Sequence, residues 1–274
     1  MTKDIQFLEK KANWIRNKVL DMIVDANKGH IGGAYSSADI LTSIYYSGLF
    51  QFNPNNPLDD NRTRFILSKG HSCVALYVIL ADLGYFPLSE LETFCKNNSR
   101  LGGHPDRHIP GIEVDTGSLG QGLGIGSGIA LAAKLDKKPF KTMVLMGDGE
   151  CGEGSVWEAV MFAGHHKLNN LIVVIDYNKQ FATDFADDSI NLEPFANKWC
   201  AFNWDFRIVG GHSFEELYYA FNSIVKKQDK PTVIIANTIK GKGISYMERE
   251  LKFHHTVPNL EQTTIAKREL SVDN

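Results

Sequence analysis

Two short, almost wholly apolar segments, residues 142–146 and 171–175, constrain the fold of this chain most strongly. Their apolar residues are continuous instead of alternating, which is typical of strands that helices cover on both faces in a parallel sheet. Further strands are predicted at 65–67, 206–209 and 232–237, and segments of helical periodicity lie between them. The fold class is therefore predicted to be α/β, with a doubly wound parallel sheet.

Helical spacing of apolar residues accounts for most of the remaining chain. It predicts helices over 7–26, from the serines Ser36 and Ser37 to Tyr45, and over 72–83, 124–134, 155–168 and 214–226. A capping box at 89–92 predicts a short helix through Cys95, and the polar segment 261–274 is interpreted as a helix or an arm. No repeat or linker separates these elements, so residues 1–274 are expected to form a single domain.

Composition and charge argue against several classes of function. The chain has 274 residues, 43% of them hydrophobic, and a net charge of -3 without a basic run, so no nucleic-acid partner is expected. Its four cysteines include no Cys-x-x-Cys pair, which argues against a zinc site or a disulfide framework. The N-terminus is charged and no apolar run approaches a membrane span, so we expect a cytoplasmic protein without membrane contact.

Polar residues follow two of the predicted strands directly. Gly147-Asp148-Gly149-Glu150 comes after 142–146, and Asp176-Tyr177-Asn178 comes after 171–175. Because the carboxyl ends of parallel strands meet at one edge of a sheet, Asp148 and Asn178 are expected to converge on one cation. An isolated Gly-Asp-Gly is more often only a turn. Here the strand before it, the helix after it and Asn178 downstream favour a metal site.

Oxygen donors of this kind fit a magnesium-bound diphosphate. The Asp148 carboxylate, the Asn178 amide and a loop carbonyl near Gln180, with two phosphate oxygens, would nearly complete an octahedral shell. Gly149 lets the backbone approach the phosphate closely. Thiamine diphosphate is one of few cofactors that need such a pair at this separation.

The glycine-rich segment 122–128 has the spacing of a dinucleotide-binding fingerprint but the wrong context. Residues 116–121 before it do not form an apolar strand, so that interpretation fails. Small residues for close helix packing explain the segment better, and the free backbone groups of Gly117, Ser118 and Leu119 are then expected to contact a cofactor.

Histidines next to glycines recur in the predicted loops. His30, His71 and His104 each follow a glycine, and the pair His254-His255 follows a further glycine-rich segment. A lone loop histidine is usually a surface residue, but four in such positions favour donors around phosphate and sugar hydroxyls. Zinc is the rival explanation, which no spacing supports.

Four further histidines and two glutamates complete the candidates. His108, His165, His166 and His212 are interpreted as structural or surface residues. Glu150 and Glu153 stand at a helix start, where the dipole favours acids. For Glu153 a functional role is preferred.

These motifs together resemble the N-terminal, diphosphate-binding part of transketolase over nearly the whole chain. The resemblance rests on the segments 29–33, 36–41, 64–71, 103–105, 116–122, 147–150 and 240–243. It implies a metal site (Mg²⁺, or Ca²⁺ or Mn²⁺) and contacts to thiamine diphosphate. The metal ligands would be Asp148, Asn178 and the carbonyl of Gln180, and the cofactor contacts Gly149, His71, His254, Asn178, Gly117, Ser118 and Leu119.

The resemblance also implies roles in catalysis. His30, His104 and His254 match the histidines that handle the ketose donor and shuttle protons. Glu153 matches a glutamate at the dimer interface that communicates between two active sites.

The family's pyrimidine-binding domain, whose glutamate activates the cofactor, is absent from residues 1–274. We therefore expect the N-terminal subunit of a split transketolase, which self-associates into an α2β2 assembly with a C-terminal subunit carrying that domain. Its reaction would move a two-carbon ketol unit from a ketose, such as a sugar phosphate, to an aldose. The alternatives are an α-type subunit of another thiamine enzyme, such as a 2-oxoacid dehydrogenase or one of specialised sugar biosynthesis, or a non-catalytic cofactor-binding half.

Two segments depart from the family pattern. Residues 179–184 read Lys-Gln-Phe-Ala-Thr-Asp, where the family usually has a small or glycine residue near Asp184. His255-Thr256 stands where the split enzymes tend to have Gly-Lys. Both departures leave room for an altered substrate, from a specialised sugar pathway instead of pentose phosphates.

Overall fold

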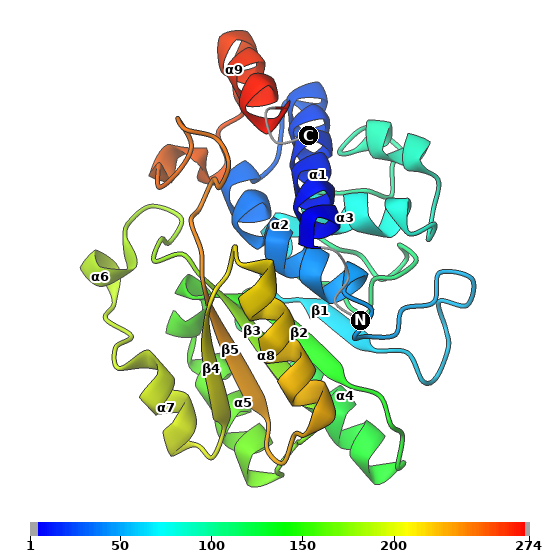
Figure 1. Cartoon of the computed structure of the whole chain (residues 1–274), viewed down its shortest axis with the longest axis vertical. Coiled ribbons are helices and arrows are strands. Elements are labelled where there is room, and N and C mark those ends of the chain that lie inside the picture. Colours follow the sequence, from blue (N-terminus) through cyan, green and yellow to red (C-terminus); the bar gives the residue numbers. More distant parts are fainter. Residues whose placement is uncertain (1–4, 272–274) are drawn as a thin grey trace.

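A five-stranded parallel sheet forms the centre of the computed structural model, which describes residues 5–271 (Figure 1). The strand order is β1-β2-β3-β5-β4, and every neighbouring pair is parallel. The strands are β1 (Arg64–Leu67), β2 (Thr142–Gly147), β3 (Leu171–Tyr177), β4 (Asp205–Gly210) and β5 (Thr232–Asn237). The five predicted strands and the α/β fold class are thus confirmed.

Helices cover both faces of this sheet, and the strands divide their side chains between two cores. One face packs against α1 (Ile5–Ala26), α2 (Ile31–Tyr46), α3 (Cys73–Asp82) and α8 (Phe214–Lys226). The other packs against α4 (Gly122–Leu135), α5 (Gly154–His165) and α7 (Phe195–Ala201). The remaining helices are η1 (Gly70–Ser72), η2 (Leu88–Thr93), η3 (Gly149–Gly152), α6 (Ala186–Ser189), η4 (Leu251–His254) and α9 (Leu260–Ser271).

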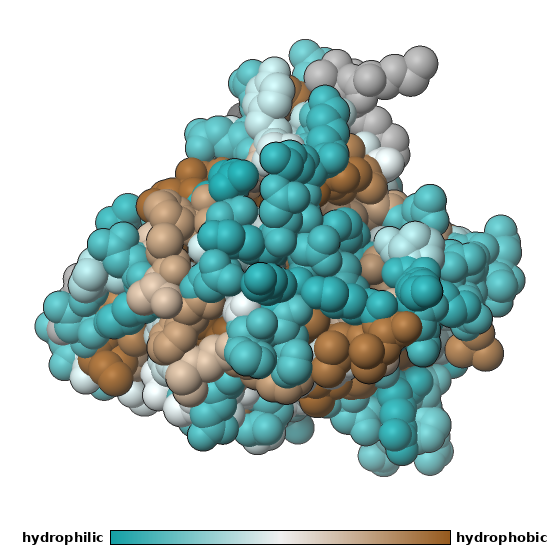
Figure 2. All heavy atoms as spheres, turned by 90° about the horizontal axis from the view of Figure 1, so that it is seen from below, coloured by the Kyte–Doolittle hydropathy of each residue, from teal (hydrophilic) through white to brown (hydrophobic). Residues whose placement is uncertain are grey.

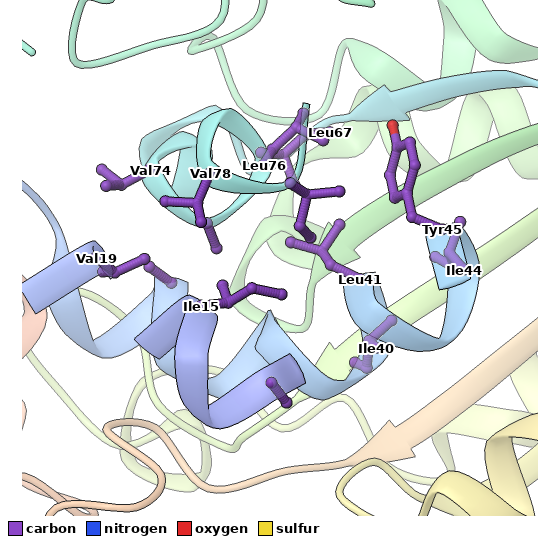
Figure 3. Packing of buried hydrophobic residues seen from close by; sticks show 14 of the residues in the cluster. Ile15, Val19, Ile40, Leu41, Ile44, Tyr45, Leu67, Val74, Leu76 and Val78 are labelled. Carbon is purple, nitrogen blue, oxygen red and sulfur yellow. The ribbon is translucent and has the colours of Figure 1, made fainter. Parts of the chain in front are cut away.

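The first core is built around α2, whose sixteen residues are all buried. Leu41 of α2 points toward Ile15 of α1 and Leu76 of α3 (Figure 3), and Ile40 belongs to the same core. Small residues such as Gly32 and Gly33 at its start let other elements approach from several sides. The first turn of α2 is therefore held firmly, directly after His30.

Two expectations about the helices were wrong, and the structure adds the helix α7. The second helix begins at Ile31, before Ser36 and Ser37, because both hydroxyls bond to the Gly33 carbonyl one turn earlier and so lie inside the helix. The expected capping box is absent: η2 begins after Pro87 without a side-chain cap. The helix α7 was not predicted from the sequence.

The C-terminal segment agrees with the expectation of a helix or an arm as far as it is described. The segment 261–274 forms the helix α9 as far as Ser271, and residues 272–274 lie outside the described part. No helix within residues 5–271 is long and apolar enough to cross a membrane. On the face seen from below, hydrophobic side chains form separate patches between hydrophilic ones (Figure 2).

Candidate functional site

A cavity of about 250 Å³ opens where β2 and β3 end. Gly147 lies beside Asp176 in the sheet register, so the residues that follow the two strands are neighbours. Seven predicted site residues line the cavity: His71, Leu119, Asp148, Gly149, Asn178, Gln180 and His254. The edge of the sheet therefore gathers residues from five separate segments of the chain.

Hydrogen bonds connect Asp148 to the segment that carries Asn178. One carboxylate oxygen accepts the N–H of Gly149 at 2.8 Å, and the other accepts the N–H of Lys179 at 2.5 Å. The Asn178 amide oxygen accepts the N–H of Gln180 at 3.0 Å. Burial, with Asp176 nearby, raises the pKa of Asp148 to about 7. A cation would favour the ionised form of this carboxylate.

A buried ion pair lies behind the cavity. Asp176 pairs with Lys69, and it also accepts hydrogen bonds from Ser36 at 2.5 Å and from the hydroxyl of Thr238. Burial alone would raise the pKa of Asp176, but Lys69 and these hydroxyls hold it below its usual value. Both carboxylate oxygens of Asp176 are thus bonded to protein groups, and the ion pair holds the Lys69 ammonium at the cavity wall.

Two lysines in the cavity lining were missed by the sequence reasoning. Lys69 and Lys240 follow β1 and β5, and Lys240 donates to the Phe181 carbonyl at 2.7 Å. Burial and the charge of Lys69 lower the pKa of Lys240 to about 8. The sequence carried a signal for both, because each stands in a Lys-Gly motif directly after a predicted strand.

The glycines of the site allow close backbone approaches. A Cβ atom at Gly149 would lie 2.6 Å from the Phe181 ring. Gly117 has a φ of 147°, and a Cβ there would lie 3.0 Å from the His104 ring. Gly117 and Ser118 are outside the cavity lining, whereas Leu119 belongs to it. The segment 117–119 therefore runs from the histidines to the cavity.

Five histidines form a cluster, here called the histidine cluster, around His30. The ring centre of His30 lies 5.3 Å from that of His254, 5.4 Å from His71, 6.2 Å from His104 and 6.4 Å from His255. Within residues 5–271, the buried Nδ1 of His254 has no hydrogen-bond partner. His30 and His104 lie outside the cavity lining but beside its histidines.

Burial keeps the inner members of this cluster uncharged. It lowers the pKa of His71 to about 2, of His254 to about 3 and of His30 to about 4, and neighbouring lysines and histidines add to the effect. At neutral pH each of these rings is therefore one donor and one acceptor. Such groups suit the hydroxyls of a sugar better than they suit a carboxylate or a phosphate.

The chemistry of the donors fits a magnesium ion. Within residues 5–271 no three or more His, Cys, Asp or Glu side chains are grouped as metal ligands, so the histidine cluster is no zinc site. The cavity instead offers one carboxylate, one amide oxygen and the loop at Gln180, and it includes two lysines. Oxygen donors with positions left for phosphate are what Mg²⁺ prefers, and the lysines suit a diphosphate.

The two glutamates of the metal motif lie in different environments. Glu153 is exposed at the start of α5 and outside the cavity lining. Glu150 is buried and accepts the N–H groups of Gly120 at 2.9 Å and Gly147 at 3.2 Å, as well as the hydroxyl of Ser68. Glu150 thus joins three segments of the site. The sequence had suggested only that an acidic residue is favourable at a helix start.

Known proteins similar to this chain agree on one family. Residues 8–274 match the family model described as transketolase, thiamine diphosphate binding domain. An apulose-4-phosphate transketolase subunit of Phocaeicola vulgatus is 42% identical, with 97% of this chain and 95% of the relative covered. The 6-deoxy-6-sulfo-D-fructose transketolase subunit SqwG of Clostridium sp. is 40% identical, with 96% of each chain covered.

Single-chain transketolases are similar over part of their length. The transketolase of Homo sapiens is 37% identical over 91% of this chain, which spans only 40% of that relative. The crystal structure of transketolase from Campylobacter jejuni superposes with a TM-score of 0.92 at 34% identity, covering 98% of this chain and 43% of that one.

Proposed function

The chain belongs to the transketolase family, where it corresponds to the N-terminal, thiamine-diphosphate-binding subunit of a split enzyme, and from this premise we propose the following function. The protein transfers a two-carbon ketol unit from a ketose donor to an aldose acceptor. It uses thiamine diphosphate and Mg²⁺, and it acts in the cytoplasm. The observation that carries the proposal is the cavity at the strand ends, with Asp148, Asn178, Lys69 and Lys240 in its lining.

The cavity residues hold the cofactor. Asp148, Asn178 and the carbonyl of Gln180 bind the metal, for which Ca²⁺ or Mn²⁺ could substitute, and the metal neutralises the diphosphate. Gly149, His71, His254 and the backbone of 117–119 contact the cofactor. When bound, thiamine diphosphate supplies the carbanion that attacks the ketose carbonyl.

The histidines act on the hydroxyl groups of the sugar. His30, His104 and His254 orient the ketose and move protons between its hydroxyls. Their neutrality supports this role, because a neutral imidazole can accept a proton on one nitrogen while it donates from the other. Glu153 acts between the two active sites of the assembly, and its exposure at the start of α5 is compatible with an interface.

A second subunit completes the active site. Residues 1–274 form one domain that binds the diphosphate, and a separately encoded C-terminal subunit supplies the pyrimidine-binding domain in an α2β2 assembly. Two similar relatives of matching length are named as subunits, which supports this proposal. Their names include a phosphorylated and a sulfonated sugar, which supports a ketose donor with an anionic end group, such as a sugar phosphate.

Reconstitution tests the proposed function. The chain is combined with a candidate C-terminal subunit, and ketol transfer is measured for a panel of phosphorylated and free ketoses. We expect activity from the pair, dependent on thiamine diphosphate and Mg²⁺, and none from either chain alone. Strong transfer by this chain alone would contradict the proposal. Turnover of a 2-oxoacid with a lipoyl-domain acceptor would instead support the dehydrogenase alternative.

A further inference from the structure

One member of the histidine cluster, His255, has no role in the proposed function. His255 is exposed and does not line the cavity, whereas its neighbour His254 does. Its ring centre lies 6.4 Å from that of His30 and 6.1 Å from that of His254. It therefore stands on the solvent side of the rings that are nearest to the cofactor cavity.

The backbone on which His255 stands is firmly held. Phe253 is 1% exposed and packs edge-on against Tyr246, with 5.3 Å between the ring centres. A Cβ atom at Gly32 would lie 2.8 Å from the Phe253 carbonyl oxygen, so η4 packs directly on the start of α2. The N–H of His255 donates to the Lys252 carbonyl. His255 is thus placed by a packed segment and does not depend on a free loop.

The separation of His30 and His255 suits a shared ligand. A hydrogen bond from a ring nitrogen to an oxygen spans about 2.8 Å, so two imidazoles whose centres are 6.4 Å apart can both reach one oxygen between them. The inner rings are neutral, so this oxygen can be that of a hydroxyl. The two rings together could hold a sugar oxygen outside the cofactor cavity.

We propose that His255 is a specificity-determining residue that, together with His30, binds an oxygen on the aldose portion of the ketose donor. This inference rests on the proposed function. The aldose portion consists of the carbons beyond the bond that breaks, which extend from the cavity toward solvent. Because an aldose acceptor occupies the same place in the second half of the reaction, His255 acts on donors and acceptors alike.

A donor that lacks the aldose portion separates this role from a general effect. Hydroxypyruvate delivers the same two-carbon unit but releases carbon dioxide in place of an aldose. In the reconstituted pair, His255→Ala should lower kcat/KM for ketose donors about tenfold and raise KM for aldose acceptors by a similar factor. With the aldose acceptor at saturating concentration, turnover of hydroxypyruvate should stay within about twofold of the wild type. His255→Gln, which keeps a donor and an acceptor, should recover part of the ketose activity.

Two controls exclude a general loss of structure. His108→Ala removes another exposed loop histidine, whose side chain is 80% exposed, and should change none of these values. Thiamine diphosphate affinity, followed by tryptophan fluorescence, should be equal for His255→Ala and the wild type. An equal loss with ketoses and hydroxypyruvate, or no loss with any donor, would overturn the role of His255. A wild-type pair without any ketol transfer would overturn the proposed function, and the role of His255 with it.

Discussion

The charged wall of the cofactor cavity and the neighbouring histidine cluster are built in opposite ways. In the wall, Asp148, Lys69 and Lys240 line the cavity and Asp176 lies directly behind them; all four are buried, and each has a hydrogen-bond or ion-pair partner within the protein. In the cluster, the inner rings are uncharged, and the buried Nδ1 of His254 lacks a partner within residues 5–271. The wall is therefore organised before a ligand arrives, whereas the cluster has a hydrogen-bonding group left for a ligand, as the proposed contact with the sugar requires.

The buried pair of the wall should show the largest effect on stability. Asp176→Ala leaves the Lys69 ammonium buried without its partner, so we expect the free energy of unfolding to fall by about 3–5 kcal/mol. Urea denaturation measures this change. The matched control is Asp229→Ala, which removes an exposed pair with Lys227 and should cost about 0–1 kcal/mol. Equal, small losses in both variants would show that the wall is not pre-organised by this pair.

Removing a cation from the wall should weaken cofactor binding. Lys240→Ala is expected to raise the Kd for thiamine diphosphate about 10- to 100-fold, because a charged hydrogen bond to a phosphate contributes roughly 1.5–3 kcal/mol. Lys242→Ala is the control, since Lys242 is on the same loop but pairs with Glu248 near the surface. Titration calorimetry compares the two. If Lys242→Ala weakened binding as much as Lys240→Ala, the proposed contact between Lys240 and the diphosphate would be refuted.

The pH dependence of the histidine ring resonances should show that the inner rings of the cluster are neutral. Burial lowers the pKa values of His71, His254 and His30 to about 2, 3 and 4, so their ring resonances in NMR should not titrate between pH 8 and pH 5. Their folded pKa values lie below the unfolded value of about 6.5. Their contribution to stability is therefore complete above about pH 6.5 and is lost as the pH falls toward 4. Titration of these rings near pH 6.5 would contradict the contrast with the wall.

The smallest effect on stability is expected for an exposed member of the cluster. His104→Ala should change the free energy of unfolding by less than about 0.5 kcal/mol, because its ring is exposed. Its proposed contact with the ketose should nevertheless make kcat/KM for ketose donors fall clearly. A large loss of stability with unchanged donor kinetics would place His104 with the structural residues of the wall.

Sequence reasoning could predict those parts of the molecule that follow from the order of strands. Continuous apolar runs located β2 and β3, the other three strands were predicted as well, and the ends of β2 and β3 placed Asp148 beside the segment of Asn178. It failed where long-range packing decides the outcome. The helix α7 is held by the buried residues Phe195 and Trp199. The helix cap expected at Ser89 does not form, because a 3-10 helix begins directly after Pro87.

The partners of the buried charged residues were harder to predict than the candidate metal ligands. Asp176 looked like part of the motif that leads to Asn178, but only the packed structure shows it paired with Lys69. Glu150 and Glu153 are alike in sequence context, yet one is buried among three segments and the other is exposed. Partners of buried charges come from distant segments, and a single sequence does not contain those pairings.

Binding of thiamine diphosphate to the reconstituted pair, measured by calorimetry with and without Mg²⁺, examines the metal site itself. We predict that wild-type binding needs the metal and that Asp148→Ala and Asn178→Ala each weaken it by at least about 100-fold. Binding that is indifferent to Mg²⁺, or equally tight in both variants, would show that these two residues do not hold the cation at the diphosphate.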